Sequence, residues 1–155
     1  MKKLALGLML VLLFGVAFRA IRSDAPDARL LFDHIWVDHL PRDQTDKFQA
    51  LWVSGEHPFG NFSTRTVWTG QWEMFHYHVI PREQGVLDFL FGRTTERQRV
   101  RYTARPCHED GFDFCLELSG SSRGVSRYFS KKEWQMKAGD PDAAGDLVRA
   151  AIEKP

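Results

Sequence analysis

Histidines are the residues of this chain best suited to bind a metal ion. His76 and His78 stand two positions apart, so on a β-strand both side chains point to the same face, a spacing that can serve a metal. His34, on an earlier predicted strand, is the candidate third ligand if that strand lies nearby. The competing interpretation is that these histidines are solvated or structural.

The face to which the histidines point is ambiguous in the sequence. Phe75 and Tyr77 alternate with them, which makes the histidines outward-facing. Trp72 and Met74, however, share the parity of the histidines, and a β-bulge between Trp72 and Phe75 would resolve the conflict. We therefore expect solvated or structural histidines, keep metal or haem binding as an alternative, and predict no cofactor.

No arrangement of nucleophile, base and acid stands out. Asp33–His34 and Asp38–His39 are neighbours in the sequence, so on a strand the two members of each pair point to opposite faces and form no dyad. The serines between 119 and 126 lie in turns without a nucleophile-elbow pattern. A phosphate loop and a Cys-x-x-Cys motif are both missing from the sequence. The expectation leans against an enzyme.

Aromatic side chains are abundant, at 13% of the chain with five Trp. Such residues either line a cavity for a small apolar ligand or fill the core of a small barrel, and a filled core is the commoner outcome. Their alternation with polar residues indicates inward-facing positions without showing whether the interior is hollow. The candidate lining residues are Trp36, Trp52, Trp68, Trp72, Phe75, Tyr77, Phe89, Phe91, Tyr102 and Phe114.

The N-terminus has the pattern of an export signal. Lys2 and Lys3 precede an uninterrupted apolar run over 4–18, and Arg19 follows it. The run is shorter than the roughly 20 residues that cross a bilayer as a helix, which favours a cleaved signal peptide. Its small-residue cleavage pattern is poor, which keeps a membrane anchor open. We expect 1–22 to be a signal peptide or anchor, 23–29 a linker, and the remainder to lie in a bacterial periplasm or on the outer face of the inner membrane.

The charge balance excludes a nucleic-acid binder. The chain has 21 basic and 20 acidic residues; the first 23 residues hold four basic and no acidic ones, which leaves 17 basic against 20 acidic side chains. Nucleic-acid affinity rests on neutralising phosphates and requires the opposite balance. A local basic stripe is most simply a solvated face; it consists of Arg93, Arg97, Arg99, Arg101 and Arg105.

Short segments of strand character, separated by Gly- and Pro-containing turns, occupy most of the chain after residue 29. The close spacing leaves little room for crossover helices and so predicts an antiparallel sheet. Residues 62–69 are either an eighth strand or a short helical turn. The predicted strands are 30–40, 47–54, 71–80, 86–91, 98–106, 112–119 and 124–130.

The hairpin around residue 110 allows a prediction of register. Opposite charges pair outside and apolar residues pair inside if Arg105 lies opposite Asp113 and Arg101 opposite Glu117. Phe112, Phe114, Leu116 and Leu118 then face inward, and Gly111 supplies the positive φ of a three-residue loop.

The two cysteines, Cys107 and Cys115, are in conflict with that register. An oxidising compartment makes a disulfide the default. The predicted register instead sets Cys115 four residues away from Cys107 along the strand, about 13 Å, whereas a disulfide requires Cα atoms within roughly 7 Å. Both hold only if Pro106 begins a wider loop that folds Cys107 back. We favour the disulfide.

A C-terminal helix is predicted over 140–153. Asp140 can cap it and Pro141 suits its first position. Leu147, Val148 and Ile152 fall on one apolar face, which must lie against the outside or the open end of the sheet. The fold class is thus mainly β: an antiparallel seven- to eight-stranded barrel or curved sheet with a C-terminal helix, preceded by an apolar signal or anchor helix.

This pattern, together with Gly70-Gln71-Trp72, resembles the lipocalin-like calycin barrels, whose short signature is G-x-W. In lipocalins that signature lies on the first strand, whereas here it falls in mid-chain. The resemblance implies binding of a small apolar ligand. We expect an exported, non-catalytic barrel that binds such a ligand or, alternatively, an envelope protein–protein interaction module with a filled core; an uncleaved N-terminal segment would add contact with the membrane.

Overall fold

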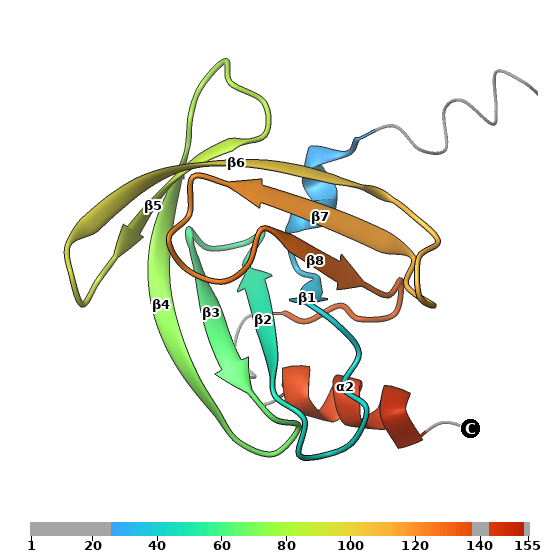
Figure 1. Cartoon of the computed structure of the whole chain (residues 1–155). Coiled ribbons are helices and arrows are strands. Elements are labelled where there is room, and N and C mark those ends of the chain that lie inside the picture. Colours follow the sequence, from blue (N-terminus) through green and yellow to red (C-terminus); the bar gives the residue numbers. More distant parts are fainter. Residues whose placement is uncertain (1–25, 138–142, 154–155) are drawn as a thin grey trace, which may run out of the picture.

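A computed structural model describes residues 26–137 and 143–153. Eight antiparallel strands follow one another around a closed barrel, each hydrogen-bonded to its neighbours in sequence, and the last pairs with the first (Figure 1). The predicted fold class is confirmed, and 62–69 proves to hold the end of a strand. The strands are β1 (Ile35–Val37), β2 (Phe48–Val53), β3 (Phe59–Arg65), β4 (Gly70–Val79), β5 (Val86–Phe91), β6 (Glu96–Pro106), β7 (Phe114–Ser119) and β8 (Arg127–Ser130).

The first predicted strand, 30–40, is largely wrong. A short 3-10 helix, η1 (Ala28–Leu31), occupies its beginning, capped by the Asp27 side chain, which accepts a hydrogen bond from the Arg29 amide at 2.9 Å. Only Ile35–Val37 form a strand. The signal peptide or anchor predicted at 1–22 lies outside the described residues, and no helix among those described is long and apolar enough to cross a bilayer.

The predicted register of the β6–β7 hairpin is wrong by two residues. Arg105 lies opposite Cys115, not Asp113, and Arg101 lies opposite Ser119, not Glu117. For the paired residues of β6 and β7, the predicted inward and outward faces are correct, because a shift of two residues preserves parity. The Cys107 amide donates to the Asp113 carbonyl at 2.8 Å, so the loop spans 108–112 and is wider than the predicted three residues.

Two apolar clusters stabilise the fold, one inside the barrel and one outside it. Because the outer face of β1 and β2 is covered, Ile35, Trp36 and Val37 are all buried. Trp52 belongs to the outer cluster and donates its indole N–H to the Met136 carbonyl at 3.0 Å. Phe112, predicted to face inward, also lies outside, stacked on Phe129 with ring centroids 5.2 Å apart.

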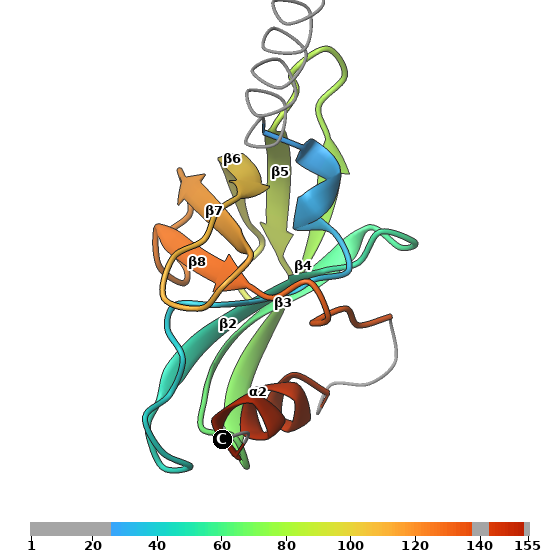
Figure 2. The same ribbon diagram turned by 90° about the vertical axis from the view of Figure 1, so that its right-hand side faces the viewer.

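Helix α2 (Ala143–Glu153) covers the outer cluster beside the lower ends of β2 and β3 in both views (Figure 2). Ala144 and Val148 are buried there, which confirms the predicted amphipathic helix; its start, predicted at Asp140, lies outside the described residues. Gly145 permits the close approach, because a Cβ at this position would stand 2.5 Å from the Val67 carbonyl oxygen.

Candidate binding surface

The interior of the barrel is occupied by the chain's own side chains. Four of the predicted lining residues are no more than 1% exposed: Trp36, Phe75, Phe89 and Phe91. The rings of Phe75 and Phe89 stack with their centroids 4.2 Å apart. Phe62 adds a fourth phenylalanine ring to this cluster. Tyr77 and Tyr102 are also buried against it, and Phe114 is partly buried at its margin.

One end of the barrel is closed by η1. The Trp36 indole N–H donates to the Leu31 carbonyl at 3.0 Å, and the Asp27 amide donates to the Ala104 carbonyl at 2.9 Å. The Tyr102 hydroxyl donates to the Ala28 carbonyl at 3.3 Å. These three hydrogen bonds hold η1 across this end of the barrel.

The opposite end is closed by the loop between β7 and β8. Arg123 extends from this loop and forms ion pairs with Glu73 at 2.8 Å and Glu96 at 3.2 Å. Its guanidinium carbon lies 5.1 Å from the centre of the Phe91 ring. The hydrogen bond to Glu73 raises the pKa of Arg123, which is therefore charged at any physiological pH.

Burial also raises the pKa of three tyrosine hydroxyls. The Tyr128 hydroxyl accepts a hydrogen bond from the Val125 amide at 2.9 Å, and burial raises its pKa to about 12. Burial likewise raises the pKa of Tyr77, whose hydroxyl donates to the Ser54 carbonyl at 2.7 Å, and that of Tyr102. All three hydroxyls are structural groups of the closed core.

The three candidate metal ligands do not come together. His76 and His78 are exposed on the outer face of β4, opposite Leu90 and Asp88. His34 is 7% exposed; its Nδ1 lies 3.2 Å from the Phe32 carbonyl, and its Nε2 has no hydrogen-bond partner. Over 26–137 and 143–153, no three histidine ligand atoms lie within 4.8 Å of one another.

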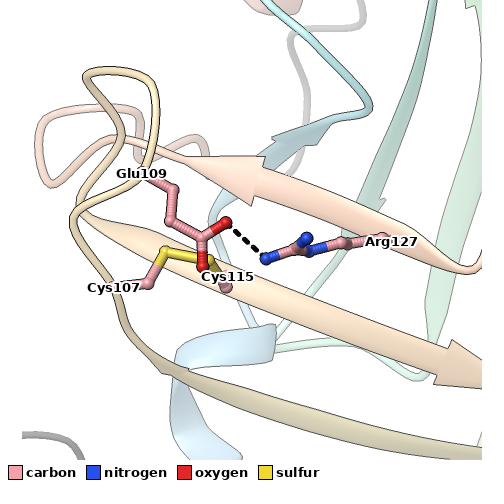
Figure 3. Close-up of a disulfide and its surroundings, with 4 residues drawn as sticks. All are labelled: Cys107, Glu109, Cys115 and Arg127. Atoms are coloured by element: carbon pink, nitrogen blue, oxygen red, sulfur yellow. Dashed lines mark hydrogen bonds and ion pairs between the residues drawn. A yellow bond between two sulfur atoms is a disulfide. The ribbon is translucent and has the colours of Figure 1, made fainter.

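The one cluster of metal-ligating side chains in the described part of the chain is Cys107, Glu109 and Cys115. Figure 3 shows why it offers no metal site: the two sulfur atoms form a disulfide, with Cα atoms 5.6 Å apart. Glu109 instead forms an ion pair with Arg127 of β8. The disulfide closes the β6–β7 hairpin, since the true register sets Cys115 opposite Arg105, two residues from Cys107.

Asp38 and His39 do contact each other, contrary to the prediction from strand alternation. Both lie beyond the end of β1, where the chain bends, and His39 Nδ1 lies 2.9 Å from Asp38 Oδ1. Asp46 lies 3.7 Å from the other ring nitrogen. The Gln49 amide donates to Asp38 at 2.9 Å, so the group closes the loop between β1 and β2.

Apolar side chains of β4 are exposed on its outer face. The register between β3 and β4 runs without a break from Phe59 opposite His76 to Arg65 opposite Gly70, so the bulge that would have resolved the ambiguity of face is not present there. Regular alternation therefore turns Trp72 and Met74 outward with the histidines, 52% and 43% exposed. Two further exposed apolar residues are Trp68, in the β3–β4 turn, and Val79, at the far end of β4.

We call Trp68, Trp72 and Met74 the Trp72 surface. Arg149 of α2 lies over the Trp68 ring at 4.5 Å, which links the helix to one side of this surface. Beside Trp72 and Met74 is an open hollow of about 700 Å³, lined also by Gly70, Gln71, Gly92 and Arg93. The cavity beneath α2 is much smaller, about 40 Å³. The larger hollow therefore adjoins the exposed side chains of Trp72 and Met74 on β4.

Sequence reasoning identified Trp68 and Trp72 as candidate binding residues but expected them to face the barrel interior. The signal that distinguishes them is the strict alternation of Phe75 and Tyr77 with the histidines, once no bulge is assumed. No family of proteins, no curated protein and no solved structure matches this chain in sequence or fold comparisons.

Proposed function

We propose that this protein is an exported, non-catalytic binding module that docks a partner protein through the Trp72 surface. The observation that carries the proposal is the contrast between a barrel interior filled by buried phenylalanines and the exposed Trp68 and Trp72 on the outside, the second of which borders an open hollow. Aromatic anchors are the side chains that most often dominate binding energy at protein interfaces.

The proposed location rests on the N-terminal segment and the cysteines. An apolar run after Lys2 and Lys3 is typical of an export signal or anchor. A disulfide between Cys107 and Cys115 suits an oxidising compartment such as the periplasm. If the segment remains uncleaved, the barrel is tethered to the outer face of the inner membrane.

The closed eight-stranded barrel has the architecture of the lipocalin-like proteins that the sequence pattern resembles. A small apolar ligand inside it would have to displace the ring cluster of Phe62, Phe75, Phe89 and Phe91. We therefore place binding on the outside of β4, where apolar surface is already exposed, and treat an internal ligand as the rival outcome.

The test is capture of partners from envelope extracts of the native host by the full chain, compared among three variants. Trp72→Ala should abolish or weaken capture of a specific partner by at least tenfold, the effect of removing a central aromatic anchor. Val79→Ala, which alters another exposed side chain at the far end of β4, is the control and should retain capture.

Equal recovery by wild type and Trp72→Ala would overturn the proposal. A parallel titration with fatty acids and retinoids, followed by Trp emission, addresses the internal ligand. A saturable blue shift that survives Trp72→Ala would assign binding to the interior instead.

A further inference from the structure

Strand β4 is longer than the strand beside it. It pairs with β3 from Gly70 to His76 but with β5 only from Phe75 to Val79. Within the described part of the chain, Gly70–Met74 therefore has no strand on its β5 side, where Figure 1 shows β5 ending high against β4. The barrel is closed, yet this segment keeps a free edge.

The backbone groups at that edge can be assigned. The Tyr77 amide donates to the Pro58 carbonyl, at 2.9 Å, toward β3. Because backbone polar groups alternate along a strand, odd-numbered residues of β4 point to β3 and even-numbered ones to the opposite side. The N–H and C=O groups of Trp72 thus face the free edge, followed by those of Met74 beside Gly92, and both side chains are exposed.

An unpaired cation borders the same edge. Arg93, in the turn between β5 and β6, is exposed and lines the hollow with Trp72 and Met74. Among residues 26–137 and 143–153 it takes part in no ion pair, whereas Arg99 pairs with Asp88 and Arg123 with Glu73. An acidic group from outside the barrel would complete this site.

We infer that the partner contributes an extended segment that adds to Gly70–Met74 as a further strand, with apolar side chains beside Trp72 and Met74 and an acidic side chain at Arg93. The inference rests on the proposed function and specifies its partner. Alternating donors and acceptors at a strand edge recognise an extended backbone, and side-chain contacts give specificity. Five residues of strand span about 16 Å.

A second copy of the chain fits this edge less well. Its own Gly70–Met74 segment would bring one acidic residue, Glu73, and that carboxylate is already bound to Arg123. Edge-to-edge pairing of two copies would therefore leave both Arg93 side chains without an acidic partner. An extended segment of a different protein that carries a free carboxylate can both hydrogen-bond to the strand edge and form an ion pair with Arg93.

The first measurement is amide hydrogen exchange on the full chain in a mild detergent. In the free protein, the Trp72 amide should exchange fast, whereas those of Glu73 and Phe75, which face β3, should exchange slowly. The probe is a phage-displayed library of random seven-residue peptides selected on this chain. Enriched peptides should carry β-branched and acidic residues and should protect the amides of Trp72 and Met74.

Two pairs of variants separate backbone pairing from side-chain contact. Trp72→Pro removes the side chain and the edge N–H, whereas Trp72→Ala removes the side chain alone, so the proline variant should bind the enriched peptide about tenfold more weakly than the alanine variant. Arg93→Glu should weaken binding about fivefold and reduce its salt dependence. Arg101→Glu on β6, equally exposed, is the control and should bind as wild type does.

The outcomes distinguish this inference from the proposed function. If Trp72→Ala loses the native partner but no peptide protects the amides of Trp72 and Met74 from exchange, the proposed function stands and strand addition is overturned. Equal peptide affinities of Trp72→Pro and Trp72→Ala would also overturn it. Protection of Trp72 that grows with protein concentration alone would assign the edge to a second copy. Because the exchange pattern of the free wild-type chain needs no variant, a misfolded Trp72→Pro still leaves the edge tested.

Discussion

Removing the ring of Phe89 tests the central physical claim, that the barrel is filled. Phe89 is fully buried on β5, and its ring lies 4.2 Å from that of Phe75 and 6.1 Å from that of Phe62. If the interior were a ligand cavity, a smaller side chain there would enlarge an existing space at little cost. In a filled core, Phe89→Ala leaves a new cavity whose lining loses its contacts.

The magnitude follows from the buried ring. Phe89→Ala removes roughly 130 Å² of buried apolar surface, about 3 kcal/mol at ~25 cal/mol per Å². Loss of the stacked contact with Phe75 adds about 1 kcal/mol. The expected decrease in the free energy of unfolding is therefore about 4 kcal/mol, within the usual 3–5 kcal/mol for a buried Phe.

The assay is urea unfolding followed by Trp emission, with the slope of the transition compared between variants. Val79→Ala, at a position 63% exposed, is the control and should change stability by less than about 0.5 kcal/mol. Where Phe89→Ala is too unstable to measure, Phe89→Leu should cost about 1 kcal/mol. A cost below about 1 kcal/mol for Phe89→Ala would refute the filled barrel and return the interior to the list of binding sites.

Three further perturbations test the fold that supports the proposed binding surface. Replacing Cys107 and Cys115 by Ala opens a loop with a sequence separation of 8. This should lower stability by about 2.5 kcal/mol and the Tm by about 10 °C, measured by calorimetry against the disulfide-bonded wild type. Because burial raises the pKa of Tyr128 to about 12, the folded state keeps a proton that the unfolded chain loses above about pH 10. The free energy of unfolding should therefore fall by roughly 2–3 kcal/mol between those two pH values. Tyrosinate absorbance should rise only when the protein unfolds. Gly145→Ala should destabilise by about 1–3 kcal/mol despite its better helix propensity, seen as an earlier urea transition, because the new methyl group meets the Val67 carbonyl.

The barrel could be predicted because strand character is local. Alternation within β6, where Val100, Tyr102 and Ala104 point inward, depends only on the two-residue period of an extended chain. The predicted faces of the paired residues in β6 and β7 are correct even though the predicted register is wrong. The register differs by two residues, and a shift of two leaves each side chain on the same face. The register itself depended on the conformation of the loop 108–112, which charge pairing at the exposed Arg101 and Arg105 is too weak to determine.

The misplaced tryptophans have a different cause. Trp52 and Trp72 both point to the outer face of the sheet, yet an inward position was expected for both, because a large apolar residue on a strand usually marks the core. Whether an outward Trp is buried depends on α2 and the segment 131–137, which pack over β2 from far along the chain. Alternation within one strand carries no information about that packing.

Exposure at β4 differs from ordinary apolar surface because side chains and backbone are open at the same place. A single exposed Trp needs no functional explanation, since much of any protein surface is apolar. A free strand edge flanked by exposed Trp72 and Met74 carries a risk of unspecific pairing, which proteins usually suppress with charged side chains, proline or a covering element. Here α2 packs on the outer cluster with its Arg149 over the Trp68 ring, and within residues 26–137 and 143–153 no strand pairs with the edge beside Arg93. Because the described residues seal both ends of the barrel yet leave this edge uncovered, the open edge is better explained by a partner that occupies it than by incomplete packing.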